Sequence, residues 1–183
     1  GGASVADLTI RGDSLVTASG ITTKTTGVVT INGSAGLTLA ATIGTLTTGG
    51  SVVNNSTGTV TLGSGTTTAG IDVAVAYTGG AGADKLSIGA TTQAITLGEG
   101  NDTLSMTGAA FGTGGSVDAG GGTTDTLVMT SANAATASLT AAFEAKISNF
   151  EVVSLGATAT GGGDIVDVAN LDDISTVRSA GTT

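Results

Sequence analysis

The chain has 183 residues, and 36 Thr, 32 Gly and 27 Ala together make up more than half of it. It contains no Cys, His, Pro or Trp, which excludes disulfide bonds, thiolate zinc sites and catalysis by a cysteine or histidine side chain. Five basic against 14 acidic residues give a net charge of −9, which argues against nucleic-acid binding, and no apolar run approaches the ~18–20 residues of a membrane span.

Short β-strands are predicted along most of the chain, because apolar residues recur at positions i and i+2. Gly, Asn, Asp and Ser lie between these groups and are typical of turns. Short strands separated by frequent turns indicate a sandwich, a barrel or a β-solenoid. In chain order the alternating groups are Leu8/Ile10, Val29/Ile31, Leu37/Leu39, Val60/Leu62, Ile71/Val73/Val75, Leu86/Ile88, Ile95/Leu97, Leu104/Met106 and Leu127/Met129.

One helix is predicted, near residues 136–147. In this Ala-rich segment Leu139, Phe143 and Ile147 recur at i, i+4 and i+8. Lys146 lies near the C-terminal end, where a cation interacts favourably with the helix dipole. The segment that follows returns to the strand pattern, so the helix is a single interruption in a β-rich chain.

The composition favours a folded chain with a thin core. Hydrophobic residues make up 39% of the chain and charged residues 10%, and the mean hydropathy is +0.40, whereas disordered chains are usually poor in hydrophobic residues and rich in charge. Aromatic residues contribute only 2%, so small aliphatic side chains must form the core. A solenoid suits such a composition, because each coil buries a few aliphatic side chains against its neighbours.

A nine-residue repeat decides in favour of the solenoid. Residues 79–87 match the pattern G-G-x-G-x-D-x-U-x, in which U is a large aliphatic residue, at every fixed position. Residues 97–105 match it except for Leu97, and residues 120–128 match it except for Thr123. The predicted fold class is therefore all-β: a parallel β-solenoid of the β-roll type, with short strands and one short helix.

The repeats place three aspartates at one edge of the coils. Asp84 and Asp102 are 18 residues apart, which is two repeats, so we expect them to stack in adjacent coils about 4.8 Å apart. Asp125 follows Asp102 after 23 residues, so the coil between them is longer by five. The turns near residues 89–93 and 108–115, at the opposite edge, contain no Asp.

This arrangement predicts a calcium site at that one edge. Stacked carboxylates repel one another unless a cation lies between them. Calcium accepts six to eight oxygen ligands at about 2.4 Å in irregular geometry, whereas magnesium demands a tighter octahedron and zinc prefers nitrogen or sulfur. The alternative is that each Gly-Asp pair is an ordinary turn.

The distribution of charge agrees with a cation partner. Residues 1–70 sum to zero, whereas residues 71–183 carry the whole net charge of −9. An ordinary acidic surface of a secreted protein is the alternative explanation. The chain starts without Met and shows no signal-peptide pattern, so we expect it to be an excerpt of a longer protein.

Residues 77–95 resemble a segment of the Caulobacter-type crystalline surface-layer (S-layer) proteins of the RTX calcium-binding family, and the similarity continues through residues 115–118, 120–128 and 150–151. The resemblance implies a calcium-dependent protein that leaves the cell by type I secretion and builds a two-dimensional lattice on the bacterial surface. It also implies calcium ligation by the aspartates and by backbone carbonyls at the matching turn positions. The implied metal ligands are Gly80, Gly82, Asp84, Gly98, Gly100, Asp102, Gly121, Thr123 and Asp125.

The sequence analysis thus predicts three regions: Thr/Gly/Ala-rich coils over residues 1–76, calcium-binding coils over 77–130, and a short helix followed by further coils over 131–183. No nucleophile–base arrangement is present, so no enzymatic activity and no cofactor other than Ca²⁺ are expected. The expected partners are other copies of the protein in a lattice and, through parts outside this segment, cell-surface polysaccharide. Nucleic acid and membrane-spanning segments are not expected.

Two other functions stay open at this stage. The chain is also compatible with a repeat spacer of an RTX adhesin or another type I-secreted exoprotein, with the active module elsewhere. The Thr-x-Thr groups Thr45/Thr47 and Thr57/Thr59/Thr61 resemble the Thr rows of ice-binding β-helices, but their register breaks along the chain.

Overall fold

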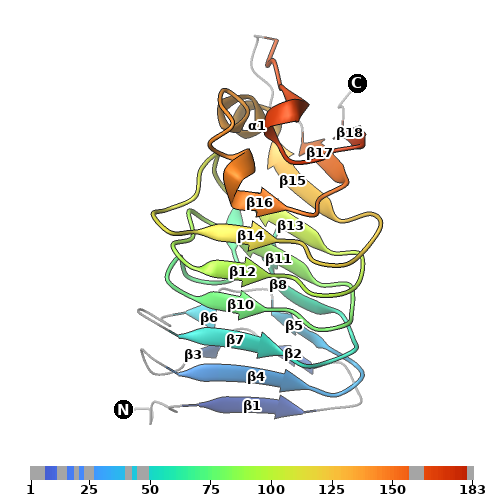
Figure 1. Ribbon diagram of the computed structural model, residues 1–183. Coiled ribbons are helices and arrows are strands. Elements are labelled where there is room, and N and C mark those ends of the chain that lie inside the picture. Colours follow the sequence, from blue (N-terminus) through green and yellow to red (C-terminus); the bar gives the residue numbers. More distant parts are fainter. Residues whose placement is uncertain are drawn as a thin grey trace.

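The chain winds into stacked coils, which confirms the predicted parallel β-solenoid (Figure 1). The structure is a computed structural model that describes residues 7–11, 16–18, 21–22, 27–39, 43–44, 50–156 and 163–180. Two parallel sheets face each other across a narrow core, and the two described ends of the chain lie at opposite ends of the stack. The predicted boundary at residues 76–77 lies inside a paired strand, whereas the one at 130–131 lies where a strand ends and a helix begins.

The first sheet, sheet A, has seven strands in the order β1-β4-β7-β10-β12-β14-β16. Every neighbouring pair in it is parallel, as expected when the chain passes once through the sheet in each coil. The strands are β1 (Leu8–Arg11), β4 (Val28–Asn32), β7 (Ser51–Asn54), β10 (Ala76–Thr78), β12 (Ala94–Thr96), β14 (Ser116–Asp118) and β16 (Ile147–Ser148).

The second sheet, sheet B, contains the other strand of each coil, in the order β18-β17-β15-β13-β11-β8-β5-β2. A separate short pair, β3 (Ile21–Thr22) and β6 (Ile43–Gly44), adds a third side to the first coils. The strands of sheet B are β2 (Val16–Ala18), β5 (Leu37–Leu39), β8 (Val60–Ser64), β11 (Lys85–Ile88), β13 (Thr103–Met106), β15 (Thr126–Thr130), β17 (Val152–Gly156) and β18 (Thr176–Ala180).

The coils differ in length although their strands stay in register. Tyr77 pairs with Ile95, 18 residues later, which is the spacing of a two-repeat β-roll coil. In contrast, Leu8 pairs with Val29 after 21 residues, and Val117 pairs with Ile147 after 30. In the 30-residue coil the additional residues include helix α1 (Ser131–Ala137). The 18-residue period of a β-roll is thus present in one coil, and coils of more variable length surround it.

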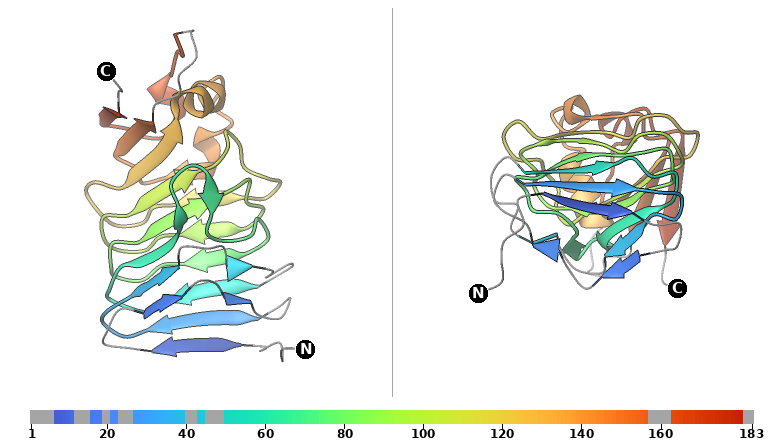
Figure 2. Two further views of the ribbon diagram at one scale, coloured as in Figure 1. Left: turned by 180° about the vertical axis from the view of Figure 1, so that it is seen from behind. Right: turned by 90° about the horizontal axis from the view of Figure 1, so that it is seen from below.

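One such loop folds back over the outside of sheet B. Strand β9 (Thr68–Ala69) pairs antiparallel with the end of β8, and the resulting hairpin lies over β11 (Figure 2). The Ser87 hydroxyl donates to the Gly65 carbonyl at 2.6 Å, and the Gly70 N–H donates to the Ser87 carbonyl at 2.7 Å. Ser87 is therefore buried although it points out of the sheet.

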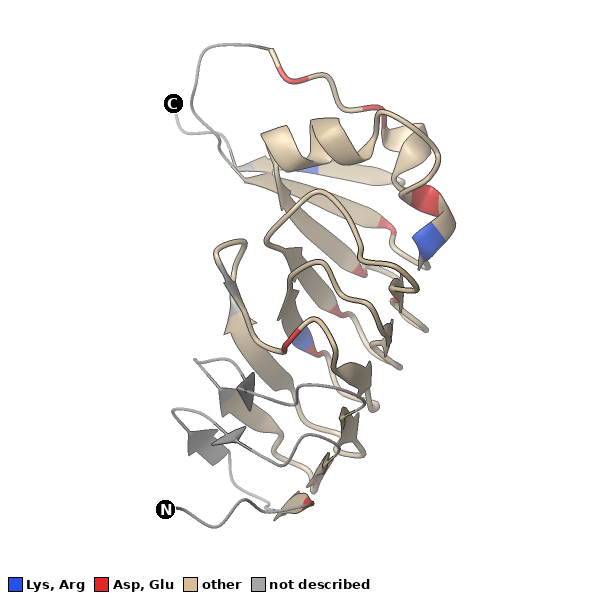
Figure 3. Cartoon of the chain, turned by 90° about the vertical axis from the view of Figure 1, so that its left-hand side faces the viewer, with Lys and Arg blue, Asp and Glu red and all other residues tan. Residues whose placement is uncertain are grey.

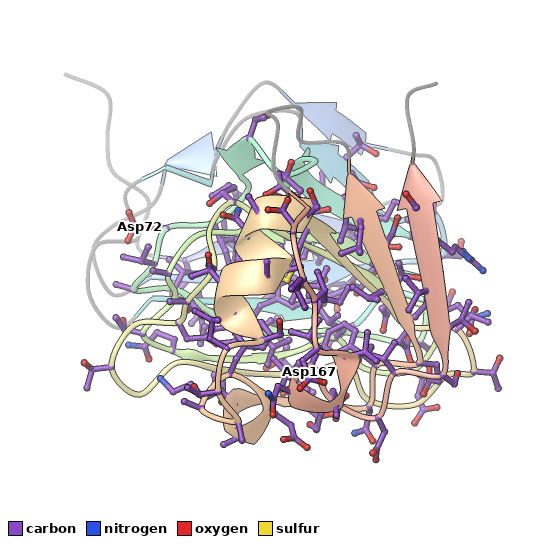
Figure 4. All side chains as sticks on the ribbon, turned by 90° about the horizontal axis from the view of Figure 1, so that it is seen from above. Asp72 and Asp167 are labelled. Carbon is purple, nitrogen blue, oxygen red and sulfur yellow. The ribbon has the colours of Figure 1, made fainter. Side chains whose placement is uncertain are left out.

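The core is a set of aliphatic columns, because inward positions in successive strands are aligned by the parallel register. Leu62, Leu86, Leu104 and Leu127 occupy equivalent positions in consecutive strands of sheet B, and none is more than 2% exposed. Burying one such side chain stabilises the fold by about 1.5–3 kcal/mol. Figure 4 shows side chains filling the space between the sheets.

The predicted helix is present, but its predicted bounds, near residues 136–147, are wrong. Helix α1 spans Ser131–Ala137 and begins early because the Thr130 hydroxyl accepts the Asn133 N–H at 3.1 Å, which is N-capping. It ends at Ser138, so Leu139 lies outside the helix and is 77% exposed. Phe143 is buried, but it lies outside helix α1, directly before a separate 3₁₀ turn.

Two 3₁₀ turns complete the secondary structure, η1 (Glu144–Lys146) before β16 and η2 (Val168–Asn170) before β18. Ile147 is buried as the first residue of β16. The i, i+4, i+8 apolar pattern thus spans three different elements instead of one helical face. Within the part of the chain that the structure describes, no helix has the length and apolar character needed to cross a membrane.

Candidate metal centre

The three predicted aspartates stack in one column at one edge of the solenoid. Lys85, Thr103 and Thr126 are aligned in sheet B, so the residues directly before them, Asp84, Asp102 and Asp125, are also neighbours. The column continues to Glu151, which precedes β17. We call these four residues the acidic column, and Figure 3 shows acidic positions succeeding one another from coil to coil.

Each acid of the column uses one oxygen to bind the coil before it. Asp102 Oδ1 accepts the Asp84 N–H at 2.6 Å, Asp125 Oδ1 accepts the Asp102 N–H at 2.6 Å, and Glu151 Oε2 accepts the Asp125 N–H at 2.8 Å. Asp84 Oδ1 accepts the Val60 N–H at 2.9 Å in the same way. The column is therefore a repeated carboxylate–amide contact that continues as far as Glu151.

The second carboxylate oxygen distinguishes the members of the column. Asp102 Oδ2 and Asp125 Oδ2 are buried and have no hydrogen-bond partner in the described part of the chain. Their residues are 1% and 0% exposed, so bulk water does not reach them. An unsatisfied buried acceptor costs about 1–3 kcal/mol, and more when it is charged, so these two oxygens call for a cation or a proton.

Asp84 is buried equally well, but the protein satisfies its second oxygen. The Asn54 amide and the Tyr77 hydroxyl each donate to Asp84 Oδ2 at 2.8 Å. Ser56 holds the Asn54 side chain in this orientation, because its N–H and hydroxyl both donate to Asn54 Oδ1, at 2.9 and 2.6 Å. The sequence analysis missed Asn54 and Tyr77 as parts of the site.

Burial raises the pKa of the aspartates in the column. Desolvation raises the pKa of Asp102 to about 7, with the charges of Asp84 and Asp125 adding to it and the Asp84 N–H opposing it. Desolvation also raises the pKa of Asp125 and that of Asp84, the latter against hydrogen bonds from Val60, Tyr77 and Asn54. The environment therefore disfavours negative charge that is not matched by a positive partner.

Glycine allows the turns beside the column to stack closely. Gly98 and Gly120 have φ of +102° and +90°, a region that favours glycine. A Cβ at Gly98 would collide with the Gly80 carbonyl oxygen, and one at Gly120 would collide with that of Gly98. Backbone carbonyls of successive turns therefore lie directly against the next coil.

The predicted carbonyl ligands lie in these stacked turns. The carbonyls of Gly80, Gly98 and Gly121 each accept one inter-coil N–H, at 2.7–2.8 Å, which leaves each a second lone pair. A Cβ at Gly122 would lie 2.5 Å from Asp125 Oδ2 and would collide with the Gly100 carbonyl oxygen. The Gly100 carbonyl oxygen and the unpaired Asp125 Oδ2 therefore border the same small space. Gly82 occupies the equivalent position one coil earlier, beneath Gly100.

The third turn departs from the repeat at Thr123, as its sequence indicates. The Thr123 N–H donates to Asn101 Oδ1 at 3.0 Å, and the Thr124 N–H donates to the same oxygen at 3.3 Å. An asparagine side chain of the preceding coil thus orders the part of the turn where the motif has glycine. Whether Thr123 provides a carbonyl to a metal stays a prediction.

The donor set in the turns is chemically suited to a hard cation. It consists of carboxylate and carbonyl oxygens only, two of the carboxylate oxygens are buried and unpaired, and calcium tolerates such irregular sets. Among the residues that the structure describes, no three acidic side chains converge on one point. A bound ion would therefore take one or two carboxylates from the column and its remaining ligands from carbonyls or water.

Asp72 belongs to the opposite edge of the solenoid, where the sequence analysis did not place it. Asp72 lies at the rim of the solenoid (Figure 4), and the adjacent Val73 carbonyl accepts the Thr92 N–H at 2.7 Å. Asp72 Oδ1 accepts the Ala74 N–H at 3.0 Å, an ordinary turn contact.

Of the Thr groups that resemble ice-binding rows, the pair Thr45/Thr47 lies outside the residues that the structure describes.

The geometry of the acidic column is the basis for assigning the site. It depends on contacts between residues 18 to 30 positions apart, which only the coil register brings together. Comparisons with protein-family models, with curated proteins and with solved structures gave no match for this chain.

Proposed function

We propose that this chain is a calcium-binding segment of a secreted bacterial surface-layer protein and that its role is structural. The observation that carries the calcium part is the pair of buried, unpaired carboxylate oxygens, Asp102 Oδ2 and Asp125 Oδ2, which repeat at equivalent places in successive coils. The proposed ligands are these carboxylates and the carbonyls of the stacked glycine turns, with Ca²⁺ supplying the missing positive charge.

Calcium would contribute stability that the thin core does not provide. A ligand that binds only the folded state stabilises it by RT ln(1 + [L]/Kd), which is about 2.7 kcal/mol for one site at a hundredfold excess over Kd. That is a large fraction of the about 5–15 kcal/mol of a typical domain. Calcium would therefore stiffen the coils that contain the acidic column.

Titration of the purified chain with calcium tests this part of the proposal. We expect heat of binding in isothermal titration calorimetry and a higher unfolding temperature in calcium than in chelator. Replacing Asp102 and Asp125 by Asn should abolish both effects, whereas Asp72→Asn, on the opposite edge, should preserve them. If the unmodified chain neither binds calcium nor changes its unfolding temperature, the proposal is wrong.

The lattice part of the proposal rests on the resemblance of residues 77–95 to surface-layer proteins. It includes export by type I secretion, self-association on the cell surface, attachment to polysaccharide through other parts of the protein, and the absence of enzymatic activity. Electron microscopy of the native cell surface tests it. An ordered array labelled by an antibody against this chain supports a surface-layer role, whereas scattered label on isolated fibres would indicate a spacer in an adhesin.

A further inference from the structure

Each of the three aspartates of the acidic column faces a gap between two coils, and these three gaps have the same backbone contact but different surroundings. Glu151, which is not fully buried, faces a fourth gap above them. The lower gap lies between the coil of β7 and β8 and that of β10 and β11, with Asp84 facing it. The middle gap is one coil higher and is faced by Asp102, and the upper gap is the next, faced by Asp125. In each gap the aspartate Oδ1 accepts the N–H of the preceding coil, at 2.6–2.9 Å.

We infer that calcium occupies only the middle and upper gaps, and that Asn54 and Tyr77 take its place in the lower gap. This inference rests on the proposed calcium binding and adds the number of ions and the residues that end the series. In the lower gap two neutral donors converge on Asp84 Oδ2, both at 2.8 Å. Both oxygens of the Asp84 carboxylate therefore already accept hydrogen bonds, and Oδ2 accepts two of them.

The coil register shows that the other gaps lack these donors. Tyr77 pairs with Ile95, and Ile95 pairs with Val117, so the equivalents of the tyrosine are aliphatic. Asn54 is the last residue of β7, and the residues in the equivalent position after β10 and β12 are Gly79 and Leu97. None of these four side chains has a hydrogen-bond donor, which explains why Asp102 Oδ2 and Asp125 Oδ2 have no partner.

The donors of the lower gap are fixed in place rather than adaptable. Asn54, Ser56 and Tyr77 are all at most 2% exposed, and two donors from Ser56 hold the Asn54 oxygen. The amide nitrogen therefore faces Asp84, since the oxygen is already engaged elsewhere. An ion entering this gap would have to displace two hydrogen bonds from a closed polar network.

Counting bound calcium ions tests the inference directly. The wild-type chain should bind two ions in calorimetry and in equilibrium dialysis with calcium alone. Asp102→Asn and Asp125→Asn should each remove one ion, whereas Asp84→Asn should leave two. A third ion that disappears in Asp84→Asn would overturn the inference and leave the proposed function intact, whereas no bound ion at all would refute the proposed function itself.

A complementary variant converts the lower gap into a site. Replacing Asn54 by Asp and Tyr77 by Phe removes both donors and adds a carboxylate, so the double variant should bind three ions. A folded double variant that still binds two would contradict the role given to the two donors. The wild-type count requires no substitution, so the number of ions can be refuted even if this variant does not fold.

Discussion

Replacing Asp102 by Asn should have opposite effects with and without calcium. Asn retains the oxygen that accepts the Asp84 N–H at 2.6 Å and has nearly the same shape. It removes the negative charge from the buried, unpaired Oδ2. Without calcium the variant should therefore be more stable than the wild type, and with calcium it should be less stable, because it has lost an anionic ligand.

The size of the gain without calcium follows from the pKa of Asp102. Burial raises it from 3.8 to about 7, and each pKa unit corresponds to about 1.36 kcal/mol, so the ionised side chain costs the fold about 4 kcal/mol. The variant recovers only part of this, because its new amide N–H₂ group needs acceptors and because relaxation and water reduce the cost. We expect a gain of about 2 kcal/mol above about pH 8.

The dependence on pH has a definite sign. An acid whose pKa is raised by folding contributes stability that is present below its unfolded pKa, near 3.8, and is lost as the pH rises through the folded value of about 7. Urea unfolding in chelator should therefore show wild-type stability falling between about pH 4 and about pH 7, and the difference from the variant should vanish near about pH 4. A variant less stable than the wild type in chelator at about pH 8 would refute the reasoning.

Three further substitutions test separate parts of the structure. Tyr77→Phe should lower stability by about 2 kcal/mol both with and without calcium, measured by urea unfolding, because it removes a hydrogen bond to a buried carboxylate; a loss confined to the calcium-bound state would contradict this. Gly98→Ala should cost at least about 2 kcal/mol from backbone strain and collision with the preceding turn, whereas Gly108→Ala, which has open space, should cost less than about 0.5 kcal/mol, and equal effects would contradict the turn geometry. Leu127→Ala should cost about 2–5 kcal/mol, whereas Leu139→Ala should be nearly neutral because that residue is exposed; a large loss at the second would restore the predicted longer helix.

The fold and the edge on which the acids stack were predictable from local patterns. Alternation of apolar residues marks strands directly, and the 18-residue spacing of Asp84 and Asp102 is the coil length where the motif is strict. The same pattern correctly aligned Asp125, because the five additional residues precede its turn and do not change the spacing from the turn to β15. The local sequence pattern was therefore sufficient to predict the position of a residue wherever the nine-residue repeat itself sets that position.

The donors to Asp84 were not predictable in this way. Asn54 is 30 residues from Asp84 along the chain, and the coils vary between 18 and 30 residues, so no fixed period brings the two together. Tyr77 lies in a strand, where a lone aromatic residue indicates core packing before it indicates a hydrogen-bond donor. The bounds of the helix were predicted wrongly for a different reason. Apolar residues at helical spacing can also lie in a turn and in the strand that follows it, as Phe143 and Ile147 do, when each side chain is buried by its own element.

The acidic column continues a position that is aliphatic in the earlier coils. Leu37 pairs with Val60, and Val60 aligns with Asp84 through the neighbouring pair Thr61 and Lys85. Leu37 and Val60 are fully buried, so at this position the earlier coils gain stability from apolar contact under all conditions. Asp102 and Asp125 are equally buried, so part of the negative charge of residues 71–183 lies in the interior. Under the proposed calcium binding, the coils that contain these two aspartates would be stabilised by a cation at neutral pH, whereas Leu37 and Val60 stabilise their coils by apolar contact alone.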